Sequence, residues 1–98
     1  MIKEEQITKV LKAVGDPKRR QILKLLTSKG CCSIDKKFGL CACDIEERVQ
    51  LSQPTVSHHM KILADAGLVE AQKMGQWMWY RRNEKAIEEF VEALGQGL

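Results

Sequence analysis

The sequence predicts a mainly α-helical fold with a small β-hairpin wing, which is the winged helix-turn-helix class. Three patterns predict this class. Amphipathic helical segments dominate the chain, two of them are separated by a very short break, and two strand-like runs follow directly. The expected order is helix, helix, cysteine loop, helix, helix, strand, strand, helix. Because the chain has 98 residues, we expect residues 1–98 to form a single domain.

The first two helices are predicted from apolar spacing and helix-end signals. Residues 3–14 carry apolar side chains at helical spacing, and Gly15 stops the pattern. Asp16 is a good N-cap and Pro17 suits the first helical position, so a second helix is expected to run from there to Gly30. The segment CCSIDKKFGLCACD follows and holds all four cysteines. We expect it to be a loop.

The helix-turn-helix is predicted in the middle of the chain. Asp44 is expected to begin a short helix that ends at Val49. A two-residue break follows, and its Ser52 can cap the next helix, Gln53–Ala66. This second helix would be the recognition helix.

A hairpin is predicted directly after the recognition helix. The runs LVEAQKM and WMWYRRN are strand-like and flank Gly75-Gln76, which is typical of a tight turn. We call this hairpin the wing. Its aromatic residues are expected to pack beneath it rather than to form a platform for single-stranded nucleic acid. Residues 84–94 then show a clean helical apolar pattern.

The exposed face of the recognition helix and the wing are predicted to contact DNA. Short hydrogen-bonding side chains crowd the start of the helix, which suits entry into the major groove. Basic side chains on the wing suit phosphate contacts, which make affinity salt-dependent. The candidate DNA-binding residues are Gln53, Thr55, Ser57, His58, Lys61, Lys73, Gln76 and Arg81. His59 lies nearer the buried face, so we expect it to pack against its neighbours.

The charge distribution also favours a polyanionic partner. Residues 17–83 carry twelve Lys/Arg against six Asp/Glu, whereas residues 84–98 carry one Lys against four Glu. A basic middle section suits double-stranded DNA. Both histidines lie on the recognition helix, so a cysteine enzyme would lack a base near its thiols. An enzyme is therefore not predicted.

The first and last helices carry apolar stripes without an obvious internal partner for both. We expect these stripes to form the seam of a two-fold homodimer, which would present two recognition helices to a palindromic operator. The candidate seam residues are Ile7, Val10, Leu11, Ile87, Phe90, Val91 and Leu94.

The cysteines are predicted to bind a thiophilic ion. The charged start and the lack of a long apolar stretch lead us to expect a cytoplasmic chain without a membrane partner, and therefore reduced thiols. Cys41 and Cys43 are expected in extended chain beside a helix N-terminus. There they would point the same way, with lowered thiol pKa values. Either Cys31 or Cys32 would complete a three-thiolate site.

Such a site suits arsenic(III) or antimony(III), with cadmium, lead or bismuth as alternatives. A thiol redox switch is a further alternative, and no organic cofactor is expected.

The sequence resembles the arsenical-repressor (ArsR/SmtB) family of bacterial winged-helix regulators along essentially its whole length. The matching segments are AVGDPKRRQILKLL, CACDIEE, LSQPTVSHHMKILADAGLVEAQKMGQWMWYR and the last helix. The resemblance implies a homodimeric repressor that binds operator DNA when metal-free and leaves it when its inducer binds. The C-x-C-D ligand motif of arsenic-, cadmium- and lead-sensing members maps onto Cys41, Cys43 and Asp44.

Two departures from the family pattern refine this expectation. The last helix has no histidine, so the site of zinc- and nickel-type members is not expected. Cadmium- and lead-type members of the family draw further cysteines from an N-terminal extension, whereas this sequence has none before Cys31. We therefore expect the third ligand to come from Cys31 or Cys32. Both departures favour arsenic or antimony without excluding cadmium.

Overall fold

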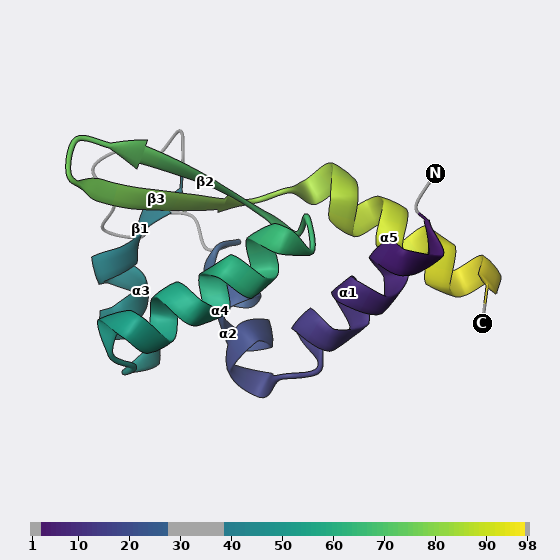
Figure 1. The fold of residues 1–98 in the computed structure, drawn as a ribbon, viewed down its shortest axis with the longest axis horizontal. Helices are drawn as coiled ribbons and strands as arrows, with labels where there is room; N and C mark the ends of the chain where they lie inside the picture. The colour runs from purple at the N-terminus through teal and green to yellow at the C-terminus, as the bar shows by residue number, and fades with distance from the viewer. Residues whose placement is uncertain (1–2, 28–38, 98) are drawn as a thin grey trace.

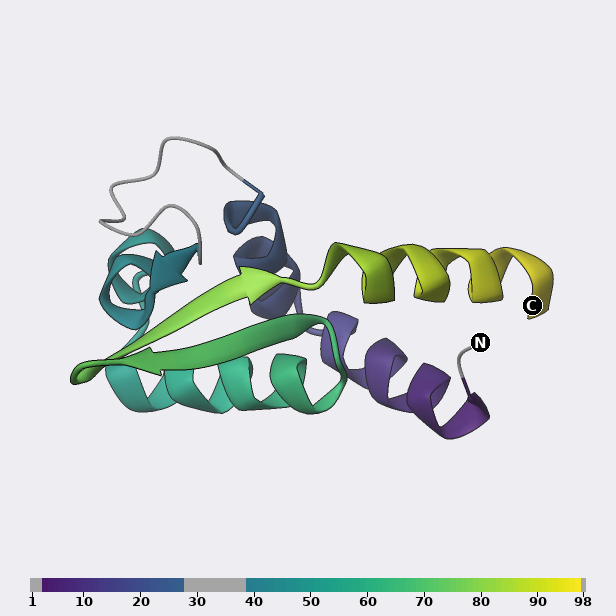
Figure 2. The same cartoon turned by 90° about the horizontal axis from the view of Figure 1, so that it is seen from above.

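The computed structural model describes residues 3–27 and 39–97 and has the predicted winged helix-turn-helix architecture (Figure 1). The elements in chain order are α1 (Glu4–Val14), α2 (Pro17–Leu25), β1 (Leu40–Cys41), α3 (Ala42–Val49), α4 (Gln53–Asp65), β2 (Val69–Met74), β3 (Trp77–Arg82) and α5 (Glu84–Gly97). The wing tip lies at one end of the long axis, and α5 and the start of α1 lie at the other (Figures 1 and 2).

The helix-start signals act as the sequence predicts. The Asp16 carboxylate accepts hydrogen bonds from the backbone N–H groups of Lys18 and Arg19 at 2.7 and 3.2 Å, and Pro17 opens α2. Ser52 caps α4 by accepting from the Thr55 N–H at 3.4 Å. Each cap satisfies backbone donors that a helix leaves free in its first turn.

Two predicted helix boundaries are wrong. The second helix, α2, ends at Leu25 rather than at Gly30, and Gly30 itself lies outside the described residues. The first helix of the helix-turn-helix, α3, begins at Ala42 instead of Asp44 and ends where Gln50 adopts a left-handed φ of 55°. That residue turns the chain into the short break before α4. The start of α3 therefore takes in the C-A-C segment.

The wing is joined by a strand that the sequence did not predict. The sheet has the order β1-β3-β2, and in the hairpin Met74 pairs with Trp77 across the predicted Gly75-Gln76 turn. The extra strand, β1, is antiparallel to β3 and pairs Leu40 with Tyr80 and Cys41 with Trp79. The C-terminal end of the cysteine segment is therefore part of the wing sheet.

Gly39 makes this strand pairing possible. Its φ is +108°, and a Cβ atom at this position would come within 2.1 Å of the Tyr80 carbonyl oxygen. Only glycine combines that backbone conformation with such a close approach.

The core lies between α1, α2, α3, α4 and the base of the wing. The largest side chains in it with less than 2% exposure are Ile22, Ile45, Met60, Leu63, Leu68, Val10 and Val56. Val10 and Phe90 were expected in the dimer seam, but they are only 1% and 7% exposed within the single chain. Their packing is therefore mainly intrachain, because the inner faces of α1 and α5 border this core.

Trp79 and Tyr80 are buried beneath the wing as predicted, whereas Trp77 near its tip is 51% exposed. No helix in the described ranges is both long and apolar enough to cross a membrane.

Candidate thiol site and DNA-binding surface

The thiol site is built where β1 ends and α3 begins. Cys41 is the last residue of β1 and the N-cap of α3, with an extended φ and ψ of −79° and 161°. Its side chain is buried, whereas Cys43 in the first turn of α3 is exposed. One ligand atom from each of Cys41, Cys43 and Asp44 lies within 4.8 Å of the other two. This compact group can present two soft sulfurs and one carboxylate oxygen to an ion.

The two thiols approach each other for a different reason from the one predicted. Extended chain was expected to point Cys41 and Cys43 in the same direction, but Cys43 lies within α3. The change from strand to helix at Cys41 brings the two sulfurs together instead. Asp44 completes the cluster and accepts a hydrogen bond from the Cys41 thiol at 3.4 Å. From the sequence, Asp44 was predicted to begin a helix. The family resemblance also placed Asp44 in the C-x-C-D ligand motif.

The thiol of Cys41 is held in its protonated form. Burial raises its pKa to about 11, and the adjacent Cys43 thiol and the Asp44 carboxylate add to this, while the Asp44 backbone N–H opposes it. The prediction that the helix N-terminus lowers the pKa is therefore wrong for Cys41, because desolvation and neighbouring acidic groups outweigh the helix dipole. An ion that binds the Cys41 sulfur must displace a proton from it.

Cys31 and Cys32, the two candidates for a third sulfur, lie outside the described residues. Their part in the site remains a prediction.

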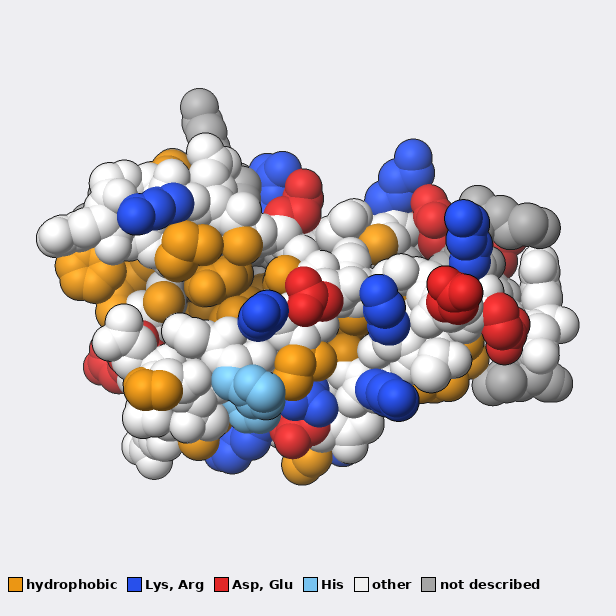
Figure 3. Space-filling view, viewed as in Figure 1, with side chains coloured by type: hydrophobic (Ala, Val, Ile, Leu, Met, Phe, Trp, Pro, Cys, Tyr) orange, Lys and Arg blue, Asp and Glu red, His pale blue; other side chains and the backbone are white. Residues whose placement is uncertain are grey.

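The exposed face of α4 carries most of the candidate DNA-contacting side chains. Gln53, Ser57, His58 and Lys61 are exposed. Thr55 is half-buried, and its hydroxyl lies 2.9 Å from the Ser52 hydroxyl. Figure 3 shows histidine and Lys/Arg side chains on the molecular face over α4. This face can offer hydrogen-bond donors and acceptors to base edges.

The wing adds positive charge beside this helix. Lys73 and Gln76 are exposed near the tip, where Gly75 has a φ of +65°. Arg81 is exposed too, but its Nε lies 3.0 Å from the Glu70 carboxylate on the neighbouring strand. An exposed ion pair of this kind is screened by solvent and contributes little stability.

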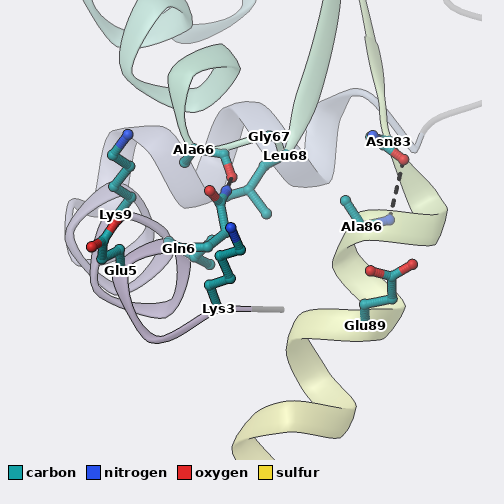
Figure 4. A pocket seen from close by; sticks show the side chains of 11 residues that line it. Lys3, Glu5, Gln6, Lys9, Ala66, Gly67, Leu68, Asn83, Ala86 and Glu89 are labelled. Atoms are coloured by element: carbon teal, nitrogen blue, oxygen red, sulfur yellow. Dashed lines mark hydrogen bonds between the residues drawn. The ribbon is translucent and has the colours of Figure 1, made fainter. Parts of the chain in front are cut away.

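The end of the molecule opposite the wing carries exposed apolar side chains and a groove. Leu11 on α1 and Val91 on α5 are 43% and 61% exposed. A groove of about 390 Å³ lies between α1, α5 and the α4–β2 corner (Figure 4). The Gln6 side chain spans its floor and donates to the Ala66 carbonyl, while Asn83 caps α5 by accepting from the Ala86 N–H at 3.1 Å. Polar and charged groups therefore form much of the groove wall.

Together these features define a class. A helix-turn-helix with a polar outer face, a basic wing and a thiol cluster at the start of its first helix defines a DNA-binding regulator with a candidate metal site. Residues 37–71 match the profile described as "Bacterial regulatory protein, arsR family".

The chain is 36% identical over 98% of its length to an uncharacterized HTH-type transcriptional regulator of Methanocaldococcus jannaschii, MJ1325, and spans 99% of that protein. It is 39% identical over 92% of its length to the arsenical resistance operon repressor of Staphylococcus aureus, of which 78% is covered. The chain belongs to the ArsR family of transcriptional regulators, which are not enzymes.

A solved structure agrees with this assignment. The chain is 26% identical to the homodimeric winged helix-turn-helix DNA-binding domain of a possible ArsR-family transcriptional regulator from Mycobacterium bovis, with a TM-score of 0.71. The match covers 92% of this chain and 76% of that one.

Proposed function

We propose that this chain is a homodimeric repressor that binds a palindromic double-stranded operator when metal-free and leaves it when arsenic(III) or antimony(III) binds its thiols. The observation that carries the proposal is the cluster of Cys41, Cys43 and Asp44 at the start of the helix-turn-helix. Cys41 and Cys43 would hold the inducer, with a third sulfur from Cys31 or Cys32.

The chemistry of the cluster fits a thiophilic ion. Thiolate sulfur selects soft metals and metalloids over hard cations, and two thiols within 4.8 Å can chelate a single ion. Trivalent arsenic supplies up to three covalent bonds to sulfur in a pyramidal arrangement. The resemblance of the chain to arsenical resistance operon repressors also supports this inducer class.

The position of Cys41 links the thiol site to both parts of the DNA-binding surface. Cys41 begins α3, which packs against the recognition helix α4, and it pairs with Trp79 in β3 of the wing. Any backbone displacement of Cys41 toward a ligand would move the start of α3 and the end of β1 together. The recognition helices and wings of a dimer would then no longer match the spacing of an operator.

Nearly complete release of DNA requires the inducer to bind one of the two protein states much more tightly than the other. Shifting a two-state equilibrium from 1:99 to 99:1 takes about 5.5 kcal/mol of differential binding. Three metal–sulfur bonds per subunit can supply this, provided that they form in only one of the two states.

The dimer is proposed to form at the end opposite the wing. Among the described residues at this end, Leu11 and Val91 are exposed large hydrophobic side chains, and Ile7, Ile87 and Leu94 are partly buried beside the core. The homodimeric state of the M. bovis relative supports a similar arrangement here.

The test is an operator-binding titration. A fluorescent duplex, selected from random DNA with the metal-free protein, is titrated with arsenite, antimonite, cadmium, lead, bismuth and zinc, and anisotropy reports DNA release. Arsenite and antimonite are expected to release the DNA. Cys41→Ser and Cys43→Ser should stay bound at every concentration. Binding that arsenite leaves unchanged would exclude the proposed inducers.

Release by cadmium, lead or bismuth alone would identify the alternative inducer class. A redox switch is less well supported, because the raised thiol pKa of Cys41 lowers the population of the reactive thiolate. It predicts release by peroxide without metal and recovery with dithiothreitol.

A further inference from the structure

His59 is a buried polar residue in the middle of the recognition helix. It is 9% exposed, and its Nδ1 lies 3.1 Å from Nη1 of Arg19 on α2. A guanidinium can only donate, and it stays protonated at all relevant pH values. Nδ1 must therefore be the acceptor, which requires a neutral imidazole with its proton on Nε2.

The same guanidinium also binds the end of α1. Arg19 Nε donates to the Ala13 carbonyl at 2.7 Å, and Nη2 donates to the Lys12 carbonyl at 3.2 Å. Carbonyls in the last turn of a helix have no partner within that helix. One side chain on α2 thus joins the C-terminal end of α1 to the middle of α4.

We propose that Arg19 and His59 form a positioning pair that fixes the recognition helix against the α1–α2 corner, and that DNA binding weakens when His59 takes up a proton. The proposal rests on the DNA-binding part of the proposed function and is independent of the thiol site. Neither side chain needs to touch DNA.

The electrostatic surroundings of His59 set the direction of the pH effect. Of the described residues, Asp16 at the N-cap of α2, Arg19 in α2 and His58 in α4 act on it, while α1 contributes the backbone carbonyls that hold Arg19. Burial lowers the pKa of His59 below 6.5, Asp16 opposes this, and Arg19 and His58 reinforce it. The unfolded chain therefore takes up this proton first as the pH falls. The stabilisation is complete above about pH 6.5 and is lost below it.

His58 provides a matched control in the same helix. Its ring centroid lies 6.0 Å from that of His59, but its side chain is exposed on the proposed DNA face. Replacing His58 therefore leaves the Arg19–His59 hydrogen bond in place.

The experiment measures affinity for the selected duplex from pH 5.5 to 8 at constant ionic strength. Wild type, His59→Gln, Arg19→Ala and His58→Gln are compared, with thermal unfolding recorded for each. Loss of one charge-assisted hydrogen bond, which is roughly twice as strong as a neutral one, predicts a change of about tenfold or more. His59→Gln keeps an acceptor at every pH, so it should bind as wild type does at pH 8 and lose less affinity at pH 5.5.

His58→Gln leaves the Arg19–His59 hydrogen bond in place, so it should not reproduce the profile of His59→Gln. Arg19→Ala removes the contacts to His59, Ala13 and Lys12, so it should bind at least about tenfold more weakly at pH 8, with the same salt dependence as wild type, since no phosphate contact is removed. A His59→Gln profile identical to the wild-type profile would overturn the positioning pair, as would an Arg19→Ala variant that loses salt dependence. A wild-type protein that selects no duplex would instead overturn the DNA-binding proposal.

Discussion

Replacing Gly39 with alanine tests whether the thiol site is built on the β1–β3 pairing. The new Cβ would lie 2.1 Å from the Tyr80 carbonyl oxygen and 3.1 Å from the Arg81 Cβ. The first of these neighbours is backbone, so it cannot rotate away. The φ of +108° adds strain of about 1–3 kcal/mol for a residue other than glycine.

Relief of the clash requires β1 to separate from β3, which removes hydrogen bonds worth about 1 kcal/mol each. We therefore expect Gly39→Ala to lower the free energy of unfolding by about 3 kcal/mol. The measurement is urea unfolding at one fixed protein concentration, because dimerisation makes apparent stability depend on concentration. Arsenite affinity should fall in the same variant, since Cys41 is the second residue of the displaced strand.

Two other glycines serve as controls. Gly75→Ala has a φ of +65° but meets no atom within 4 Å, so it carries backbone strain without a clash. Gly95→Ala lies in α5, also meets nothing within 4 Å, and should be slightly stabilising. If Gly39→Ala unfolds at the same urea concentration as Gly75→Ala, the close packing of β1 on β3 does not determine stability and the reasoning fails.

Three further predictions address the thiol site, the dimer and the recognition helix. Cadmium affinity should rise by about tenfold per pH unit for each thiol proton released between pH 6 and 8, because the Cys41 pKa is about 11. The affinity for arsenous acid should change little with pH, since each hydroxide leaves as water with the thiol proton. Isothermal titration in two buffers measures the proton release that accompanies binding of each ligand. Equal pH dependence for cadmium and arsenous acid would contradict binding through the protonated thiols. A double change of Leu11 and Val91 to lysine should yield a folded monomer by sedimentation, with Lys12→Ala remaining dimeric; a double variant that stays dimeric would place the seam elsewhere. Ser52→Ala should lower the free energy of unfolding by about 1 kcal/mol through loss of the α4 cap, and Ser52→Asp should restore it in urea titrations.

Local signals allowed most of the helical architecture to be predicted. The caps at Asp16 and Ser52 and the Gly75 turn each depend on a few neighbouring residues, so the sequence carries them directly. The strand β1 was missed because two residues show no periodicity, and the strand exists only through pairing with β3. Long-range pairing of this kind has no local signature.

The sequence predicted which described residues form the thiol site, but it did not predict the raised pKa of Cys41. The sequence shows that Cys41, Cys43 and Asp44 are neighbours, yet the pKa of Cys41 depends on burial, which tertiary packing decides. The same limit applies to Val10 and Phe90. An apolar stripe in the sequence shows that one face of a helix is buried. Whether that face is buried by the core of the same chain or by a partner subunit is shown only by the folded structure.

The pairing of Cys41 with Trp79 also gives the protein an intrinsic optical signal. Directly opposed residues on antiparallel strands place their side chains on the same face of the sheet, with Cβ atoms about 5 Å apart. The emission of the buried Trp79 indole is therefore sensitive to what its cross-strand sulfur binds, while Trp77, which is 51% exposed, emits at longer wavelength as an internal reference. Binding of the proposed inducer to the thiols is therefore expected to change tryptophan emission in unlabelled protein, before any DNA is added.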